Sequence, residues 1–517
     1  MGLAPIETWA RVLWAGRRRI GARYAVRLAA CVWGSLIGTA VTLPERVVLG
    51  PWLWWRFFRR GARGGLREGP AVVAVLGYYR SGTTHLHYVL SCDRRFVTAR
   101  WFQATAPTGW WLSWSVLRWA LIPLTPNRRP QDDMTFGPDW PAEDDFGLAA
   151  WTGASALAWR FIFPSERARA RRWLFLEGER ERRVFKRTLG AFWWKVTALA
   201  PGKRVLLKSP SHTARVRELV EVFGERVRFV HIVREPGAVI RSNTRMAERL
   251  AWYALEDLAA AQETRDTIVR EYEEVERVAR EQLAGLPEGR WSRVRYQDLI
   301  ADPLGELERV YGELGLGWTG EVEAGVTRYL HAVREYRTED QKNGAPEPEI
   351  GEAGEAEVAA CERLREVYHR EAAVAARALP EVAGVDPSVA RRRVAWALTP
   401  IVAGGCLAAW LGIAHATGNR YDTFVWVWGT VIGYAAIRAA GRGSAGLGAW
   451  AALWFLVLVG ASVWPMPEVA NGWVGVDRVK AIRTAYGTPN SNYTWIVLGA
   501  LAAWRYGSRR HVRPPGR

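Results

Sequence analysis

The chain has 517 residues, of which 49% are hydrophobic and 24% are charged. This composition is typical of folded domains and excludes a wholly disordered or a collagen-like chain. Lys and Arg (71) outnumber Asp and Glu (52), and the net charge of +19 favours anionic partners such as acidic lipids or phosphate-bearing molecules.

Residues 1–70 are predicted to form a hydrophobic segment at a membrane surface. The stretch 28–44 is uncharged, and arginines flank it on both sides. Trp52, Trp54 and Trp55 follow among further arginines, which is typical of a helix that lies in the headgroup region of a bilayer. We therefore favour an interfacial helix, with a membrane span as the open alternative, and we expect Pro44 and Glu45 to close the stretch.

Residues 71–343 are predicted to form one α/β domain. Buried strands are expected at 71–76, 205–207 and 227–233, each followed by apolar residues at helical spacing. Strands that alternate with helices indicate a P-loop-like parallel sheet flanked by helices, which binds ligands at the carboxyl ends of its strands. The basic run 167–187 is predicted to be an amphipathic helix.

The loop after the first strand runs from Gly77 to Thr84 and has the sequence GYYRSGTT. Glycine allows the backbone to turn tightly and to approach a ligand closely, and the free amides of a helix N-terminus favour an anion. The two glycines have the spacing of a nucleotide-triphosphate loop, but Thr83 stands where such a loop has lysine. The cation is Arg80, three residues earlier, so the loop indicates a site for a single anionic group.

Two further strand ends carry cations. Lys208 follows the strand at 205–207, and Arg234 follows the strand at 227–233, with Ser242 eight residues later. Because the carboxyl ends of parallel strands meet at one edge, we expect these side chains to share a crevice with the glycine loop. No aspartate that could hold a metal ends a later strand, and the four cysteines lie far apart, so no metal is expected.

These motifs, together with VRYQDLIADP at 294–303, resemble the sulfotransferase superfamily, and most of all its large bacterial branch, whose glycine loop reads RSGTT. The resemblance covers about half the chain and implies 3′-phosphoadenosine 5′-phosphosulfate (PAPS) as co-substrate. It also implies that Lys208 lies at the transferred sulfuryl group and that Arg234 and Ser242 hold the 3′-phosphate. The residues that match the family's 5′-phosphosulfate loop are Arg80, Ser81, Gly82, Thr83 and Thr84.

The general base has several candidates. An acceptor hydroxyl must lose its proton within hydrogen-bond reach, usually to a histidine or a carboxylate. Glu143, Asp144 and Asp145 follow one another in the sequence, and His212 lies four residues after Lys208. Glu143 is our first candidate and His212 the second, and the two aspartates stay open.

Residues 391–517 are predicted to form a transmembrane region of about four helices. Uncharged or apolar stretches cover 394–414, 423–437, 443–464 and 491–504. Arginines on one side of the set place that side in the cytoplasm by the positive-inside rule. A very apolar helical domain outside the membrane is the alternative, and 344–390 is expected to be a linker with a polar helix.

The sequence thus predicts a multi-pass sulfotransferase of the inner cell membrane, with its catalytic domain on the cytoplasmic face. Its acceptor would be a hydroxyl group on a small molecule or lipid, and tryptophans at 101, 110, 111, 114 and 119 favour a lipid or glycolipid. No nucleic-acid partner is expected. The alternatives are a P-loop kinase-like phosphotransferase and a non-catalytic membrane protein that binds nucleotides.

Overall fold

The computed structural model describes residues 3–59, 66, 69–111, 129, 134–257, 261–333, 355–365, 432, 449–456 and 500. Most of the predicted transmembrane region and the linker at 344–354 lie outside the described residues. The domain boundaries at 70, 343 and 390 therefore stay predictions.

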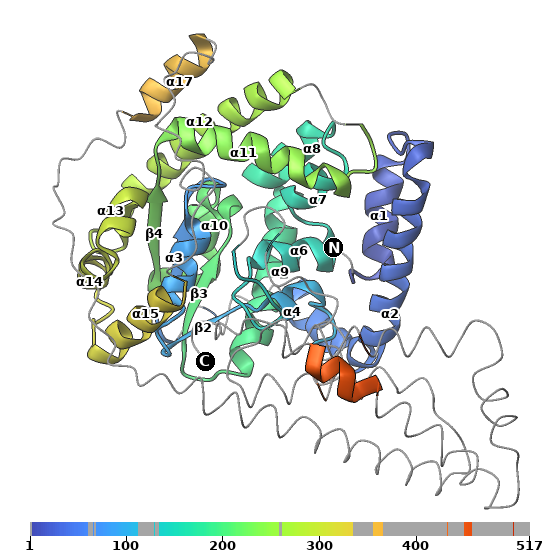
Figure 1. Cartoon of the computed structure of the whole chain (residues 1–517), viewed down its shortest axis with the longest axis horizontal. Helices are drawn as coiled ribbons and strands as arrows, with labels where there is room; N and C mark the ends of the chain where they lie inside the picture. The colour runs from blue at the N-terminus through green and yellow to red at the C-terminus, as the bar shows by residue number, and fades with distance from the viewer. Residues whose placement is uncertain are drawn as a thin grey trace, which may run out of the picture.

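A five-stranded parallel sheet forms the centre of the described structure (Figure 1). The three predicted strands are confirmed, because their continuous apolar runs are buried on both faces. The strand of only three residues was not predicted from the sequence. In spatial order the strands are β2 (Phe96–Thr98), β3 (Arg204–Lys208), β1 (Val72–Leu76), β4 (Val227–Val233) and β5 (Trp291–Arg295).

Helices cover both faces of the sheet (Figure 1). On one face, Val73 and Val75 pack with α3, α14 and α15, and on the other, Val72 and Ala74 pack with α9 and α10. Within the described residues 71–365, the α-helices are α3 (Thr83–Leu90), α4 (Trp101–Thr105), α6 (Asp144–Thr152), α7 (Ala156–Ile162), α8 (Arg167–Phe175), α9 (Glu179–Ala198), α10 (Val216–Phe223), α11 (Pro236–Leu250), α12 (Ala261–Ala284), α13 (Tyr296–Ala301), α14 (Pro303–Glu313), α15 (Gly320–Val333) and α17 (Glu355–Arg365). This layered architecture confirms the predicted parallel α/β sheet flanked by helices, whereas the predicted all-α transmembrane region lies mostly outside the described residues.

The prediction of a single helix over the basic run 167–187 is wrong, because this run forms parts of two helices. α8 ends at Phe175, and α9 begins at Glu179. Leu176 adopts the left-handed conformation with φ 51°, which ends a helix, and its side chain is fully buried. The helix therefore ends at the buried Leu176, although the charge pattern of residues 167–187 continues through this position.

Two N-terminal helices, α1 (Ile6–Gly16) and α2 (Ala25–Leu53), lie side by side against the α/β domain (Figure 1). The prediction that Pro44 and Glu45 close the apolar stretch is wrong, because Pro44 and Pro51 both lie inside α2. In the described part of the chain, Ala22–Phe57 is the one helical stretch long and apolar enough to cross a membrane, and its most apolar window of 18 residues has a mean hydropathy of 1.6. Large apolar side chains on α2 that face solvent include Val26, Trp33, Leu36, Val47 and Val48.

A buried ion pair attaches α2 to α9. Lys195 Nζ lies 2.6 Å from Glu45 Oε1 and also donates to the carbonyl oxygen of Pro107 at 2.8 Å. The two charged side chains are 0% and 3% exposed. Three tryptophan rings surround the ammonium group at 5.0–6.0 Å, those of Trp110, Trp111 and Trp151. Two of the tryptophans that the sequence analysis connected with a lipid acceptor therefore enclose this lysine.

Burial lowers the pKa of Lys195 to about 8, from an ordinary value of 10.5, and the attraction of Glu45 offsets only part of this effect. Between these two pH values the unfolded chain binds more protons at this lysine than the folded chain does. The free energy of unfolding should therefore rise with pH in that window, by at most about 1.4 kcal/mol per pH unit.

We expect the wild-type chain to gain thermal stability relative to Lys195→Met as the pH rises from 8 to 10.5. The Tm of both proteins, measured in the same detergent across this range, gives the difference. Groups outside this ion pair that titrate in the window are common to both proteins and cancel. A Tm difference that does not change with pH would show that the pKa of Lys195 is not lowered.

Candidate active site

Three strands end at the edge of the sheet where the candidate residues gather. The chain leaves β1 toward β2 and β3, and it leaves β4 toward β5 on the opposite side. In such sheets a ligand-binding crevice opens at the carboxyl ends of the strands, where the direction of winding reverses. The glycine loop follows β1, Lys208 ends β3, and Arg234 follows β4.

The glycine loop is held in an unusual backbone conformation. Gly77, Arg80 and Gly82 have φ values of 145°, 70° and 96°. A Cβ atom at Gly82 would lie 2.4 Å from the ring of Tyr296, so only glycine fits there. Arg80 adopts a left-handed conformation that costs a non-glycine residue about 1 kcal/mol or more, and such strain is common at functional sites.

Arg80, Arg234 and Ser242 form one cluster. Arg80 Nε donates to Ser242 Oγ at 2.9 Å, and Arg234 Nη1 donates to the carbonyl oxygen of Arg80 at 3.3 Å. The guanidinium of Arg234 also lies 4.6 Å from the centre of the Tyr296 ring. The expected convergence of the glycine loop with the end of β4 is thus observed, and two arginines lie together at the carboxyl edge of the sheet.

Lys208 contacts the C-terminal end of the glycine loop. Its Nζ donates to Thr84 Oγ1 at 3.2 Å, at the start of α3. No side chain caps α3, so the amides at its N-terminus stay available for an anion. Arg129, which was not predicted to be a site residue, is 5% exposed and reaches the same threonine hydroxyl at 3.5 Å.

Two fully buried serine hydroxyls near these cations lack a hydrogen-bond partner among the described residues. They are Ser81 Oγ, in the glycine loop, and Ser209 Oγ, directly after Lys208. An unpaired buried hydroxyl costs about 1–3 kcal/mol. Oxygen atoms of a bound anion would satisfy both, which fits a phosphate or sulfate ligand. Sequence reasoning singled out Ser81 but not Ser209.

Glu143 faces Lys208. The carboxylate Oε1 lies 2.7 Å from Lys208 Nζ, and the two side chains are 12% and 2% exposed. Glu143 immediately precedes α6, but its carboxylate makes no capping hydrogen bond to that helix. A candidate base and a cation therefore stand together at the end of β3.

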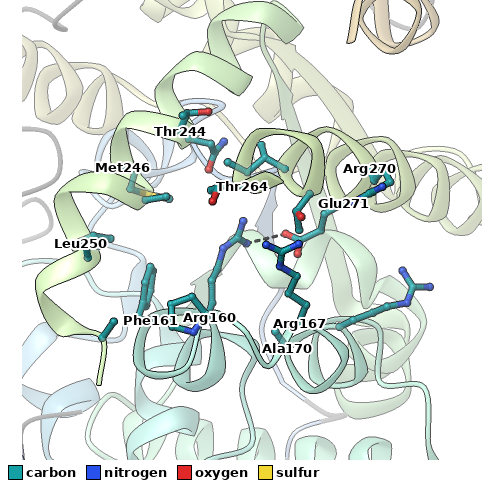
Figure 2. A pocket seen from close by; sticks show the side chains of 18 of the residues that line it. Arg160, Phe161, Arg167, Ala170, Thr244, Met246, Leu250, Thr264, Arg270 and Glu271 are labelled. Atoms are coloured by element: carbon teal, nitrogen blue, oxygen red, sulfur yellow. Dashed lines mark hydrogen bonds and ion pairs between the residues drawn. The ribbon is translucent and has the colours of Figure 1, made fainter. Parts of the chain in front are cut away.

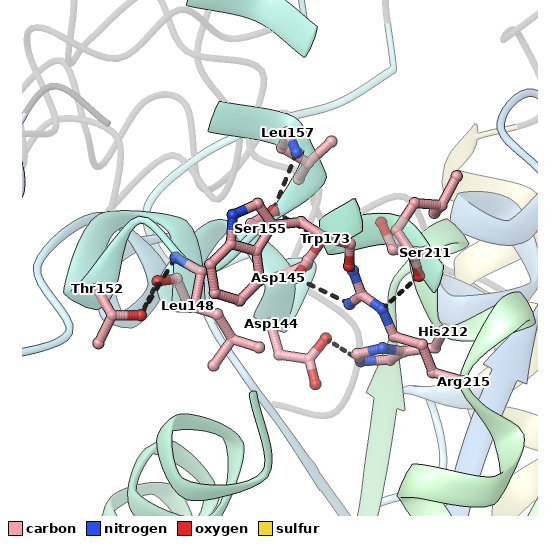
Figure 3. Close-up of polar contacts among 12 residues, drawn as sticks. Asp144, Asp145, Leu148, Thr152, Ser155, Leu157, Trp173, Ser211, His212 and Arg215 are labelled. Atoms are coloured by element: carbon pink, nitrogen blue, oxygen red, sulfur yellow. Dashed lines mark hydrogen bonds and ion pairs between the residues drawn. The ribbon is translucent and has the colours of Figure 1, made fainter. Parts of the chain in front are cut away.

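The next acidic residue points into the core of the domain (Figure 3). Asp144 Oδ1 lies 2.9 Å from His212 Nε2, and its Oδ2 accepts a hydrogen bond from Trp193 Nε1 at 2.9 Å. Asp144 and His212 are both 0% exposed. The second candidate base is thus enclosed and paired with a carboxylate.

Asp145 is part of a second internal contact set (Figure 3). Its Oδ1 accepts from Arg215 Nη1 at 3.2 Å, and its Oδ2 accepts from Ser155 Oγ at 2.9 Å. Arg215 is fully buried and also donates to the carbonyl oxygens of Leu174 and Trp173. The three consecutive acidic residues therefore have different surroundings, and only Glu143 contacts the crevice lysine.

Among the residues that the structure describes, no three His, Cys, Asp or Glu side chains lie close enough to hold a metal ion. Asp302, in the last sequence motif, accepts a hydrogen bond from the Gly305 amide at 2.9 Å and so caps α14. That residue shapes the turn after α13 and is not part of the crevice contacts described above.

Comparison with known proteins gives a consistent set of matches. A model of the Sulfotransferase family matches residues 70–320. Proteins named omega-hydroxy-beta-dihydromenaquinone-9 sulfotransferase Stf3, from Mycobacterium bovis and Mycobacterium tuberculosis, are each 30% identical over 344 residues, which cover 63% of this chain and 83% of the relative. The crystal structure of sulfotransferase STF1 from M. tuberculosis H37Rv is 18% identical, with a TM-score of 0.49, over 70% of this chain and 90% of that chain.

Proposed function

The chain belongs to the sulfotransferase family and is a PAPS-dependent sulfotransferase, and from this premise we propose that it transfers the sulfuryl group to a hydroxyl group on a lipid-like acceptor at the inner cell membrane. The observation that carries the proposal is the convergence of Arg80, Lys208 and Arg234 on the glycine loop, with Glu143 beside Lys208. Family membership sets aside the kinase-like and the non-catalytic alternatives.

We assign the two anionic ends of the donor to the two ends of the crevice. The 5′-phosphosulfate would lie on the amides at the start of α3, with Arg80 and the hydroxyls of Ser81, Thr83 and Thr84 around it, and Gly82 would allow its close approach. The 3′-phosphate would lie at Arg234 and Ser242. The unpaired hydroxyl of Ser81 and the uncapped N-terminus of α3 support the first assignment.

Lys208 and Glu143 have complementary tasks in the transfer. A bond forms between the acceptor oxygen and sulfur while the bond from sulfur to the bridging oxygen of the nucleotide breaks, so negative charge grows on the leaving nucleotide. Lys208 would stabilise that charge, and Glu143 would take the proton of the acceptor hydroxyl. The full burial of Asp144, Asp145 and His212 in mutual contacts favours Glu143 over them as the base.

The lipid-like acceptor rests on the relatives, which are named for a hydroxylated menaquinone. The membrane location rests on the exposed apolar side chains of α2 and on the arginines around it. We place the catalytic domain on the cytoplasmic face. Protease added to sealed inside-out membrane vesicles should therefore cleave the chain within 344–354, and protection of that segment would contradict this orientation.

Arg234→Ala is expected to bind adenosine 3′,5′-bisphosphate about 10–100-fold more weakly than the wild type, because a hydrogen bond to a charged group contributes about 1.5–3 kcal/mol. Titration calorimetry on the full chain in detergent measures this. Arg217→Ala, which removes an exposed arginine of α10, is the matched control and should bind normally. Unchanged affinity in Arg234→Ala would remove this residue from the donor site.

The same preparations test the acceptor class. Radiolabelled donor incubated with total membrane lipid should yield labelled lipid with the wild type and much less with Arg234→Ala. Transfer to soluble sugars without transfer to lipid would contradict a lipid-like acceptor.

A further inference from the structure

A cleft of about 610 Å³ lies between α7 and α8 on one side and α11 and α12 on the other (Figure 2). This volume is in the range of small-molecule sites in proteins. Its walls are largely apolar, and the large apolar side chains that line them are Phe161, Phe175, Met246, Leu250 and Ile268. Neither the motifs nor the donor assignment uses this cleft.

The cleft borders the glycine loop. Arg160, at the centre of the view in Figure 2, lies 4.5 Å from the ring centre of Tyr79 and pairs with Glu271 at 2.7 Å. Tyr78 donates to the same Glu271 oxygen at 2.9 Å, and Asn243 donates to the carbonyl oxygen of Tyr79 at 2.7 Å. Because Tyr78 and Tyr79 belong to the glycine loop, side chains that line the cleft contact the same stretch of chain that forms the anion site.

Contacts also lead from the cleft toward the candidate base. Phe146 packs in the same hydrophobic cluster as Tyr79 and Met246. Glu143 lies three residues before Phe146, at the start of α6. Tyr79 OH is 2.8 Å from Ser211 Oγ, three residues after Lys208. Tyr79 thus connects the cleft with the chain segments that carry Lys208 and Glu143, although these two residues do not line it.

The charges around the cleft are compensated. Arg160 pairs with Glu271, Arg167 pairs with Glu263 at 2.8 Å, and Arg171 pairs with Glu274. Arg270 and Glu248 add one charge of each sign. An anionic ligand would have to compete with these carboxylates, whereas an uncharged apolar ligand gains by leaving water.

We propose that this cleft holds the apolar body of the acceptor, and that the acceptor is an uncharged molecule that carries its hydroxyl group on an extended apolar part. The inference rests on the proposed function and names the substrate class of the same site. The donor site binds the anionic donor, the cleft binds the apolar body of the acceptor, and the hydroxyl end of the acceptor extends past the glycine loop toward Glu143.

A photoreactive probe tests the proposal without relying on catalysis. A diazirine-bearing fatty alcohol, added to the full chain in detergent, should label peptides within 160–175 and 243–251, located by mass spectrometry. Ala247→Trp places a large side chain at the cleft wall and should reduce this labelling at least about tenfold. Ala324→Trp, on the exposed surface of α15 across the sheet, is the matched control and should label as the wild type does.

A fatty acid probe of equal length tests the charge argument and should label the cleft less than the alcohol does. Equal labelling of wild type and Ala247→Trp, labelling of other segments only, or a preference for the acid would overturn the proposal. Each of these results is compatible with a functional donor site, provided that adenosine 3′,5′-bisphosphate still binds. Failure of the proposed function would instead appear as the absence of nucleotide binding and of sulfuryl transfer in the wild type.

Discussion

Glu143→Gln is expected to lower kcat for sulfuryl transfer by about 10²–10⁴-fold, the usual effect of removing a general base. Glutamine keeps the volume of glutamate and can accept a hydrogen bond from Lys208, which lies 2.7 Å from the carboxylate. It cannot take a proton from the acceptor hydroxyl. Affinity for adenosine 3′,5′-bisphosphate should therefore not weaken, which separates a loss of catalysis from a loss of folding or donor binding.

The measurement is single-turnover transfer from radiolabelled donor to membrane lipid as a function of pH. The wild type should show a rising limb with pH that Glu143→Gln lacks. Glu288→Gln is the matched control, because that side chain is exposed in the turn between α12 and β5. If Glu143→Gln keeps full activity and His212→Asn loses activity, His212 and not Glu143 is the general base.

Asp145→Ala is expected to lower the free energy of unfolding by about 3–5 kcal/mol, the effect of breaking a buried ion pair by removing one partner. Arg215 and Asp145 are both 0% exposed, and the guanidinium would stay buried without its carboxylate. Ser155 Oγ would lose the acceptor that it now has at 2.9 Å. The effect falls on the first turn of α6, next to Glu143, so activity should decline as well.

Denaturant unfolding followed by tryptophan fluorescence measures the loss. The double variant Asp145→Leu with Arg215→Met removes both charges and should be less destabilised than Asp145→Ala, since apolar side chains replace a buried ion pair without leaving an unpaired charge. A loss of less than about 1 kcal/mol in Asp145→Ala would show that Arg215 does not depend on Asp145. Its hydrogen bonds to the carbonyl oxygens of Leu174 and Trp173 would then be enough to stabilise the buried guanidinium.

The strands were predictable because buried parallel strands appear as continuous apolar runs, and β4 matches its predicted range from Val227 to Val233. The clustering of Arg80, Lys208 and Arg234 was predictable for a related reason. Each of these residues lies at a junction between a strand and a helix, and parallel strands present such junctions at one edge. The helix break at Leu176 was not predictable, because the charge pattern of the run does not change there.

The sequence by itself determined the residue types at the strand ends, and with them the family, because a glycine loop between a strand and a helix is a pattern of neighbouring residues. Tertiary structure alone decided which of three consecutive acidic residues faces Lys208. The partners of Asp144 and Asp145 that decide this are Trp193, His212 and Arg215, 49 to 70 positions away in the chain. Glu45 likewise meets Lys195 across 150 positions. Such pairs depend on how whole helices pack against one another, and this packing cannot be predicted from the local spacing of residues.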